Sequence, residues 1–305
     1  MGKIVVVGSS NTDLVVSSTK LPSPGETVLG GDFDLIAGGK GANQAVAAAR
    51  AGSDVMFVTK IGNDYFGKKA LEGYQKENIN LDKICTDNEK PSGIAVILVD
   101  EATGQNSIVV APGANSSLSI SDIKKAEKEI ALADIVLVQL EIPIETVEYV
   151  LKVAKENNVK TILNPAPAQA LSDEILAMVD IITPNETETK ILVGINPGIE
   201  QNLEEASEKL VSKVREAALI TLGEKGVYFT SRNGEHSLIP SLKVQAIDTT
   251  AAGDVFNGYF ASALSEGKGF KEAIEIANKA AAISVTKKGA QPSIPTIDNV
   301  NNLKS

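Results

Sequence analysis

Short apolar runs alternate with amphipathic segments along most of the chain. The first run, Ile4–Val7, is β-branched without polar interruption, which is typical of a strand buried on both faces of a sheet. From residue 121 the alternation is regular. We predict helices from 121, at 145–157 and at 172–179, and strands at 134–139, 161–163, 181–182 and 218–222. This alternation predicts an α/β fold, with a mostly parallel sheet and helices on both of its faces.

The residue pattern in the first half of the chain predicts a second, smaller sheet. Strands are expected at 33–36, 55–61, 93–99 and 106–110, and helices at 45–51 and from Asp64 to about 78. Residues 100–105 have the composition of a hairpin loop. The segment 14–36 and the hairpin over 94–110 are expected to form a small β lid over one edge of the main sheet. We therefore expect one α/β domain over residues 1–305, with the lid attached.

A helix near the C-terminal end starts with unusual chemistry. Apolar residues recur at helical spacing over 255–264, so we predict a helix that begins close to Asp254 and ends before Gly267. The preceding Ala-Ala-Gly at 251–253 leaves the free N–H groups of the first turn open to an anion. A carboxylate there repels an anion unless it takes part in the chemistry, as a base for a hydroxyl would. The alternative is a turn followed by a first-turn acid. A second helix is predicted over 270–285.

Polar residues follow several predicted strands. Asn11 and Asp13 come just after the first strand, at the edge where open α/β sheets bind ligands. Their side chains suit the hydroxyl groups of a sugar, and a simple turn is the alternative. Glu141 and Asn164 follow two later strands in the same way. These positions predict a polar site along one edge of the sheet.

Residues 38–44 read Gly-Gly-Lys-Gly-Ala-Asn-Gln. The glycines allow a ligand to approach the backbone, and Lys40 and Asn43 offer hydrogen-bond donors. The run is not a Walker A loop, because glycine rather than Ser or Thr follows the lysine. It is not a dinucleotide fingerprint either, because Gln44 stands where a third glycine belongs. A structural strand-to-helix turn is the alternative.

Three further segments allow both a structural and a functional interpretation. Asn185 and Glu188 have the spacing of a helix capping box, and Glu188 would also orient water or Mg²⁺ near phosphates. The glycines of 223–226 allow a nucleotide to lie against the backbone, or form a plain hairpin. Residues 287–293 are irregular and rich in carbonyl groups, which suits a bound cation or a simple loop.

Composition narrows the classes of partner. An apolar fraction of 43% over 305 residues supports a substantial core. A net charge of −10, with 4% aromatic residues and no Trp, argues against a nucleic-acid partner. Single Cys85 and His236 residues exclude an internal disulfide and a His-cluster metal site, so any metal has oxygen ligands. Neither a membrane span nor a signal peptide is recognised, so we expect a cytoplasmic protein.

Two stretches together point to a family. Residues 38–45 and 248–254 resemble the two signatures of the ribokinase-type (PfkB) carbohydrate kinases, and 185–188 lies between them as in that family. The resemblance covers nearly the whole chain. It implies a ribokinase-like α/β sandwich with a β lid, ATP as phosphoryl donor, Mg²⁺, an activating K⁺, and a homodimer formed through the lid.

The resemblance also implies a role for each matching residue. Asp254 matches the catalytic base, and Ala251, Ala252 and Gly253 match the anion hole. The positions that match the sugar site are Asn11, Asp13, Gly39, Lys40, Asn43 and Glu141, together with Asp254. Those that match the ATP site are Asn185, Glu188, Thr221, Gly223, Gly226, Gly253 and Asn278, with Glu188 also acting on Mg²⁺ through water. Those that match the K⁺ site are Asp248, Thr250, Ser284, Lys287, Gly289 and Ser293.

The resemblance therefore predicts transfer of the ATP γ-phosphoryl to O5 of D-ribose, which yields ribose 5-phosphate and ADP. The alternatives are a fructokinase or nucleoside kinase of the same family, or a non-catalytic sugar- or nucleotide-binding regulator. A nucleoside acceptor calls for aromatic stacking, and the segments of the first half that would cover the substrate have few aromatic residues, with Phe33 the nearest. The helix N-terminus is expected to lower the pKa of Asp254. This suits phosphoryl transfer, because the hydroxyl proton leaves late.

Overall fold

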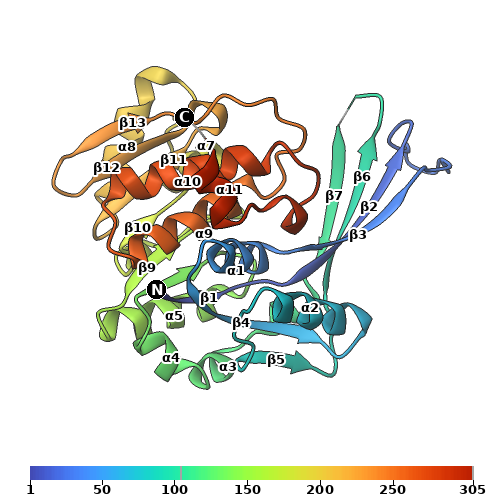
Figure 1. Ribbon diagram of the computed structural model, residues 1–305, viewed down its shortest axis with the longest axis horizontal. Helices are drawn as coiled ribbons and strands as arrows, with labels where there is room; N and C mark the ends of the chain where they lie inside the picture. Colours follow the sequence, from blue (N-terminus) through green and yellow to red (C-terminus); the bar gives the residue numbers. More distant parts are fainter. Residues whose placement is uncertain (104, 304–305) are drawn as a thin grey trace.

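A large twisted sheet forms the centre of the molecule (Figure 1). The computed structural model describes residues 1–103 and 105–303. Its strands are β1 (Lys3–Val7), β4 (Asp54–Gly62), β5 (Ile84–Asp87), β8 (Ile135–Val138), β9 (Lys160–Leu163), β10 (Ile181–Ile182), β11 (Ala217–Thr221), β12 (Val227–Ser231) and β13 (His236–Ile239). In the described part of the chain they form nine strands in the order β13-β12-β11-β10-β9-β8-β1-β4-β5. All neighbours pair in parallel except β11 with β12 and β12 with β13.

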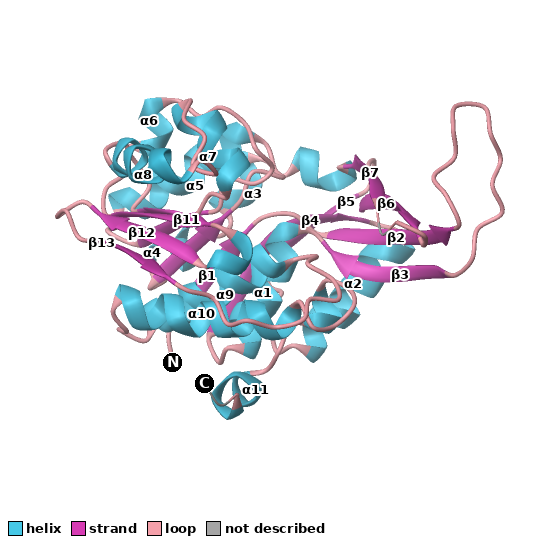
Figure 2. Ribbon diagram, turned by 90° about the horizontal axis from the view of Figure 1, so that it is seen from above, coloured by secondary structure: helices cyan, strands magenta, loops and turns pink. Residues whose placement is uncertain are grey.

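Helices cover both faces of this sheet (Figure 2). One face carries α1 (Lys40–Arg50), α2 (Tyr65–Lys76), α9 (Ala252–Ser265), α10 (Phe270–Ser284) and α11 (Ile297–Asn302). The other carries α3 (Ile120–Lys124), α4 (Glu127–Ala131), α5 (Ile144–Glu156), α6 (Asp173–Leu176), α7 (Glu186–Val193) and α8 (Leu203–Val211). The mostly parallel sheet between two helical layers confirms the predicted fold class.

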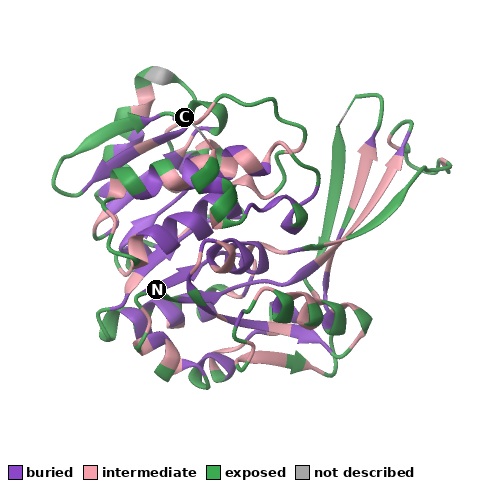
Figure 3. Ribbon diagram, in the orientation of Figure 1, coloured by how far each residue is buried: buried purple, intermediate pink, exposed green. Residues whose placement is uncertain are grey.

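The central strands divide their side chains between two apolar cores. On β1, Ile4 and Val6 pack beneath α1 and α9, whereas Val5 and Val7 pack on the other side. Each fully buried aliphatic side chain contributes roughly 1.5–3 kcal/mol relative to an exposed one. Figure 3 shows how burial concentrates in these strands and in the helices against them. The alternation explains why a strand buried on both faces has no polar position.

Helices α1 and α9 pack unusually closely. A Cβ atom on Gly258 would lie 2.5 Å from the Cβ of Ala47, so only glycine fits at this crossing. The close packing holds the N-termini of both helices together at the carboxyl edge of the parallel strands. That edge is where the predicted site residues gather.

A separate four-stranded sheet projects from the core (Figure 1). It consists of β2 (Asn11–Ser18), β3 (Phe33–Gly38), β6 (Gly93–Asp100) and β7 (Asn106–Ala111), in the order β3-β2-β6-β7. Leu14 pairs with Leu35 and with Val96, and Val96 pairs with Val109, so these four side chains share one face. Leu35, Val96 and Val109 are 48%, 37% and 70% exposed. The opposite face carries the polar side chains at the start of β2.

Several predicted bounds are wrong. Residues 11–13 are not a turn, because they begin β2 in parallel register with β6. The helix predicted at 45–51 begins at Lys40, because the positive φ of 90° at Gly39 turns the chain directly from β3 into α1. The helix predicted at 172–179 is shorter in the structure, where α6 spans only Asp173–Leu176. Gly104, within the predicted hairpin loop, lies outside the described residues.

The prediction of one continuous helix from residue 121 is also wrong. The segment is divided into α3 and α4, because Ala126 between them leaves the helical conformation. In the described part of the chain, no helix is long and apolar enough to cross a membrane.

Candidate active site

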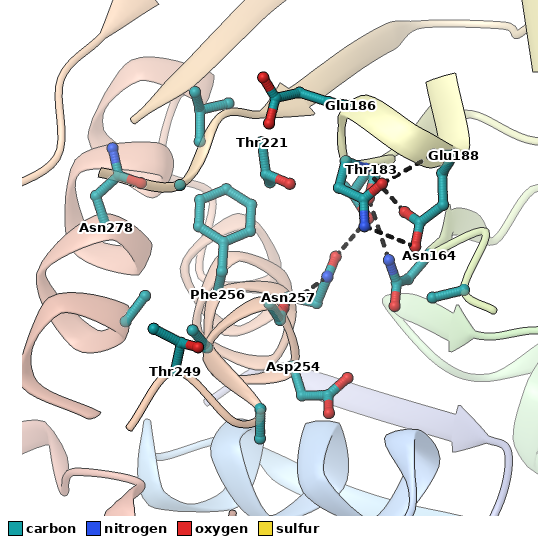
Figure 4. Close-up of a pocket in the computed structure, with 18 of the residues that line it drawn as sticks. Asn164, Thr183, Glu186, Glu188, Thr221, Thr249, Asp254, Phe256, Asn257 and Asn278 are labelled. Atoms are coloured by element: carbon teal, nitrogen blue, oxygen red, sulfur yellow. Dashed lines mark hydrogen bonds between the residues drawn. The ribbon is translucent and has the colours of Figure 1, made fainter. Parts of the chain in front are cut away.

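A cavity of about 450 Å³ opens at the carboxyl edge of the sheet, beside the N-terminus of α9 (Figure 4). Its wall includes Lys40, Asp254 and the small residues before Asp254. The structure also brings to it all the positions predicted for the nucleotide: Asn185, Glu188, Thr221, Gly223, Gly226, Gly253 and Asn278. Segments that are far apart in the sequence therefore form one continuous wall.

The N-terminus of α9 is shaped to receive an anion. Ala251 takes a left-handed conformation with φ of 62°, which costs an L-residue roughly 1–2 kcal/mol. Gly253 lines the cavity, and a Cβ atom there would meet no atom within 4 Å, so packing alone does not require glycine at this position. The open first turn exposes backbone N–H groups along the positive end of a 14-residue helix.

Asp254 lies in this first turn and is buried. One carboxylate oxygen accepts a hydrogen bond from Asn43 Nδ2 and the other from Gln44 Nε2, each at 2.9 Å. The pKa of Asp254 is raised, so the expectation of a lowered pKa is wrong. Burial is the strongest influence, and it outweighs the opposing effects of Lys40 and of the two hydrogen bonds. The Asp254 carboxylate therefore carries a higher proton affinity than its helix position alone implies.

One lysine lies among several carboxylates at this site. Burial lowers the pKa of Lys40, but the neighbouring carboxylates of Asp254, Glu141 and Glu188 together raise it by more than burial lowers it. The net pKa is therefore raised, and the side chain stays cationic. Burial raises the pKa of Asp13 to about 6, with Glu141 and Asp254 adding to the shift. This excess of acidic groups favours a bound cation or hydroxyl donors.

Asn11 and Asp13 lie on the face of β2 that carries its polar side chains. Asn11 is held by Asn115, whose Nδ2 donates to Asn11 Oδ1 at 2.7 Å. The backbone at residues 38 and 39 packs tightly against both. A Cβ atom on Gly38 would lie 2.5 Å from Asp13 Oδ2, and one on Gly39 would lie 2.7 Å from the backbone nitrogen of Asn11. The two glycines thus allow β3 and α1 to approach the polar start of β2.

Asn43 and Glu141 complete the predicted sugar positions. Asn43 Oδ1 is buried without a hydrogen-bond partner among the described residues, which leaves an acceptor for a ligand hydroxyl. Glu141 accepts hydrogen bonds from the hydroxyl of Ser9 and from the backbone N–H of Lys40, the latter at 3.1 Å. Through Asn43 and Lys40, these polar positions adjoin Asp254 and the cavity.

Asn185 and Glu188 form the capping box that their spacing indicates. Glu188 N–H donates to Asn185 Oδ1, and Asn185 N–H donates to Glu188 Oε2, both at 2.8 Å. Glu188 is nevertheless on the cavity wall, and burial raises its pKa against the effects of the Asn185 N–H and Lys40. A cation beside this carboxylate would offset the burial, so the site fits Mg²⁺ held with phosphate oxygens.

The positions predicted for K⁺ lie on two segments that contact each other, 248–250 and 284–293. Asp248 accepts hydrogen bonds from the backbone N–H of Thr250 at 2.9 Å and of Gly289 at 2.8 Å. The hydroxyls of Ser284 and Ser293 donate within their own turns. Lys287 N–H donates to the Ser284 carbonyl at 3.0 Å. The available ligands are therefore oxygens, mostly carbonyls, which suits a hard monovalent cation.

Sequence reasoning missed several polar residues of this site. Gln44, Gln139 and Asn115 are buried and hydrogen-bonded to predicted site residues or to one another. Thr183 and Asn257, also missed, are buried side chains on the cavity wall beside Asn164, which was expected at this edge (Figure 4). The available signal was that Gln139 and Thr183, like Asn164, each come directly after a buried strand.

An anion-binding helix end, a buried carboxylate beside it and an adjoining set of hydroxyl-binding groups define a phosphoryl-transfer site for a small acceptor. A family model described as pfkB family carbohydrate kinase matches residues 1–297. The chain belongs to this family of carbohydrate kinases.

Individual relatives are similar over their whole length. The ribokinase of Haemophilus influenzae is 50% identical over 293 residues, which cover 96% of this chain and 95% of the relative. The deoxyribokinase of Salmonella typhi is 37% identical over 307 residues, which cover 99% of this chain and 98% of the relative. The solved structure of Arabidopsis thaliana ribokinase complexed with ribose and ATP has a TM-score of 0.91 and 34% identity, covering 98% of this chain and 97% of that one.

Proposed function

We propose that this chain transfers the γ-phosphoryl group of ATP to O5 of D-ribose, which gives ribose 5-phosphate and ADP. The observation that carries the proposal is the position of Asp254. Its buried carboxylate lies in the first turn of α9, where it adjoins both the cavity and the polar start of β2. The full-length similarity to ribokinases supports ribose as the acceptor and ATP as the donor.

In this mechanism the ribose hydroxyl is oriented by Asp254 and attacks the γ-phosphorus. The bond from that phosphorus to the β–γ bridging oxygen breaks, ADP leaves with the electron pair, and Asp254 accepts the hydroxyl proton late in the reaction. The Ala252 N–H donates to the Thr249 carbonyl, so the N–H groups of Ala251 and Gly253 are the ones that stabilise the charge on the equatorial oxygens. Lys40, whose side chain lies among Asp254, Glu141 and Glu188, adds to that stabilisation.

The remaining positions hold the two substrates. Asn11, Asp13, Gly39, Asn43 and Glu141 bind the sugar, where buried polar groups reject an acceptor that lacks the matching hydroxyl. Asn185, Glu188, Thr221, Gly223, Gly226 and Asn278 bind the nucleotide. Mg²⁺ near Glu188, when bound, neutralises phosphate charge.

The first experiment measures ADP release with ATP, Mg²⁺ and K⁺ across four acceptors: D-ribose, 2-deoxy-D-ribose, D-fructose and adenosine. Strong preference for ribose is expected. One relative is a deoxyribokinase, so 2-deoxyribose is the alternative acceptor to test. A preference for 2-deoxyribose would reassign the acceptor. Release with fructose or adenosine alone would contradict the sugar assignment, and no release with any acceptor would favour a non-catalytic binding protein.

Replacing the base tests the mechanism directly. Asp254→Asn keeps the shape of the side chain but removes the proton acceptor, so kcat is expected to fall by roughly 10²–10⁴. ATP binding, measured by calorimetry, should remain. Turnover close to that of the unaltered protein would remove Asp254 from the mechanism.

A monovalent cation bound by Asp248, Thr250, Ser284, Lys287, Gly289 and Ser293 would fix the loop that precedes α9. The proposed consequence is activation by K⁺, because the same loop leads into the anion hole. Rates measured in matched K⁺ and Na⁺ salts test this point, and equal rates would contradict it.

The open face of the four-stranded sheet supports a homodimer. Leu14, Leu35, Val96 and Val109 lie together there, and an exposed apolar sheet face is stabilised when another copy covers it. Multi-angle light scattering at working concentration should give twice the mass of one chain. A cytoplasmic location remains part of the proposal.

A further inference from the structure

We infer that Gln44 is a positioning residue, whose buried side-chain amide holds Asp254 and the anion hole in one fixed geometry. It does so through a row of polar side chains at the carboxyl edge of the sheet. The inference deepens the proposed kinase activity and rests on it for its kinetic test.

Three adjacent parallel strands supply the row. Gln139, Asn164 and Thr183 are the first residues after β8, β9 and β10, which are neighbours in the sheet. All three side chains are buried. Because adjacent parallel strands end at the same edge, the three polar groups lie next to one another beneath the N-terminus of α9. Figure 4 shows Asn164 and Thr183 in this position beside the cavity.

Gln44, on α1, connects the row to the base. Its Nε2 donates to Asp254 Oδ1 at 2.9 Å and to Asn164 Oδ1 at 3.0 Å. Its Oε1 accepts from Gln139 Nε2 at 2.6 Å. A primary amide has two N–H donors and one carbonyl oxygen, so every polar atom of Gln44 is engaged.

Further hydrogen bonds lead from the row back to the first turn of α9, which carries Asp254. Asn164 Nδ2 donates to the Thr183 carbonyl at 3.1 Å, and the Thr183 hydroxyl donates to Asn257 Oδ1 at 2.6 Å. Asn257 Nδ2 donates to the carbonyl of Gly253 at 2.8 Å. Gly253 belongs to the proposed anion hole. Figure 4 shows the part of this path through Asn164, Thr183 and Asn257. The bonds of Gln44 connect that part to Asp254, so the whole path leads from the proposed base to the proposed anion hole.

The direction of these bonds is set by Asp254. An ionised carboxylate only accepts hydrogen bonds, so the amide nitrogen of Gln44 must face it, and the amide oxygen must then face Gln139. Reversing the amide would break all three of its bonds. Gln139 Oε1 has no hydrogen-bond partner among the described residues, but every polar atom of Gln44 has one. A buried amide that is satisfied in this way favours one arrangement over others.

The hydrogen bonds to Asp254 also counteract the repulsion between its carboxylate and the acidic side chains around it. Lys40 on α1 attracts the carboxylate, whereas Glu141 after β8, Asp13 on β2 and Glu188 on α7 repel it. Burial further favours the protonated form. The hydrogen bonds donated by Gln44 and Asn43 stabilise the ionised form, and they lower the pKa of Asp254 relative to a site without them.

The main test is Gln44→Met, which keeps the length of the side chain and removes its hydrogen bonds. We expect kcat for ribose to fall on the order of 100-fold at pH 7, because the base loses its alignment, with KM for ATP little changed. The acid limb of the kcat profile should move up by about one pH unit, since a hydrogen bond to the charged form is lost.

Gln44→Glu provides an isosteric comparison with the opposite pH dependence. When protonated, the new carboxyl can donate to Asp254, but when both groups are ionised they repel each other at hydrogen-bonding distance. Its activity relative to the unaltered protein should therefore fall as pH rises, whereas that of Gln44→Met should recover. A residue that serves only in packing would not produce the recovery of Gln44→Met as pH rises.

Ser262→Ala is the matched control. Ser262 lies on α9, away from its first turn, and its hydroxyl bonds to that of Ser53 at 2.8 Å in the same buried region between α1 and α9. Its loss should lower Tm without moving the pH profile. If Gln44→Met lowers activity only in proportion to its loss of Tm, with an unmoved acid limb, the inference is overturned.

Titration of the free protein separates this inference from the proposed function. The carboxyl ¹³C signal of Asp254, assigned by its absence in Asp254→Asn, should titrate at higher pH in Gln44→Met. An unchanged titration overturns the positioning role. Absence of ribose phosphorylation by the unaltered protein would overturn the proposed function, while the titration would still decide the role of Gln44.

Discussion

The two sheets of this molecule bury their side chains in different ways. β1 of the nine-stranded sheet is apolar on both faces, and helices cover both. The four-stranded sheet exposes Leu35, Val96 and Val109 on one face and has Asn11 and Asp13 at the start of the other. The first sheet is therefore covered within the chain, whereas the second leaves one apolar face open. The difference predicts that substitutions in the core change folding, and that substitutions in the second sheet change binding and association.

The largest effect on folding is expected at the α1–α9 crossing. Gly258→Ala would place a methyl group 2.5 Å from Ala47 Cβ and 2.7 Å from the Gln44 carbonyl, so the helices must separate. The free energy of unfolding, measured with denaturant, should fall by roughly 1–3 kcal/mol. Gly73→Ala on α2 is the control, because a Cβ there meets no atom within 4 Å, and it should be neutral or stabilising by up to about 1 kcal/mol. Equal losses in both variants would contradict the packing argument.

At the start of the second sheet, Asp13 should decrease stability while supporting binding. Its folded-state pKa of about 6 lies above the ordinary value of 3.8, because of burial first and then of Glu141 and Asp254. The folded state thus binds this proton more tightly than the unfolded chain. Its contribution to stability falls as pH rises from about 4 to about 6. Asp13→Asn should therefore stabilise the free protein at pH 7 by about 1–2 kcal/mol.

The same variant should bind ribose more weakly. In the unaltered protein, KM for ribose should rise about tenfold between pH 7 and pH 5 as Asp13 is protonated, and Asp13→Asn should remove most of that dependence. Thermal unfolding and steady-state kinetics at several pH values measure both effects. A destabilised Asp13→Asn protein at pH 7 would refute the raised pKa.

The smallest effect on folding is expected on the open face of the second sheet. Leu35→Glu places a charge on a side chain that is already 48% exposed, so the free energy of unfolding of the chain itself should change by less than about 0.5 kcal/mol. The proposed dimer should nevertheless dissociate, because two copies of the charge would meet in an apolar contact. Sedimentation velocity distinguishes the two states, and an intact dimer would show that this face is not the interface.

Much of the core was accessible from sequence because its signals are local. A continuous apolar run identifies β1, and the spacing of Asn185 and Glu188 identifies a cap that the structure confirms. By contrast, α8 and β13 were not predicted at all. The start of α1 was misplaced because the backbone angle of Gly39, not the residue pattern, sets it.

The site was predictable where its residues form contiguous motifs. Gln139, Asn164 and Thr183 carry no such motif, because each is a single polar residue after a strand, and only the strand order brings them together. The direction of the Asp254 pKa shift was wrong for the same reason. A helix end is visible in the sequence, but the burial that outweighs it depends on the packing of distant segments.

A single residue, Gly39, separates β3 from α1. In the proposed mechanism, the strand belongs to the sheet that borders the acceptor, and the helix carries Lys40, Asn43 and Gln44 toward Asp254. We therefore expect a change in the tilt of β3 to pass through Gly39 to α1. On that mechanism, acceptor range and turnover change together, so a screen for new substrates should score both from the first round.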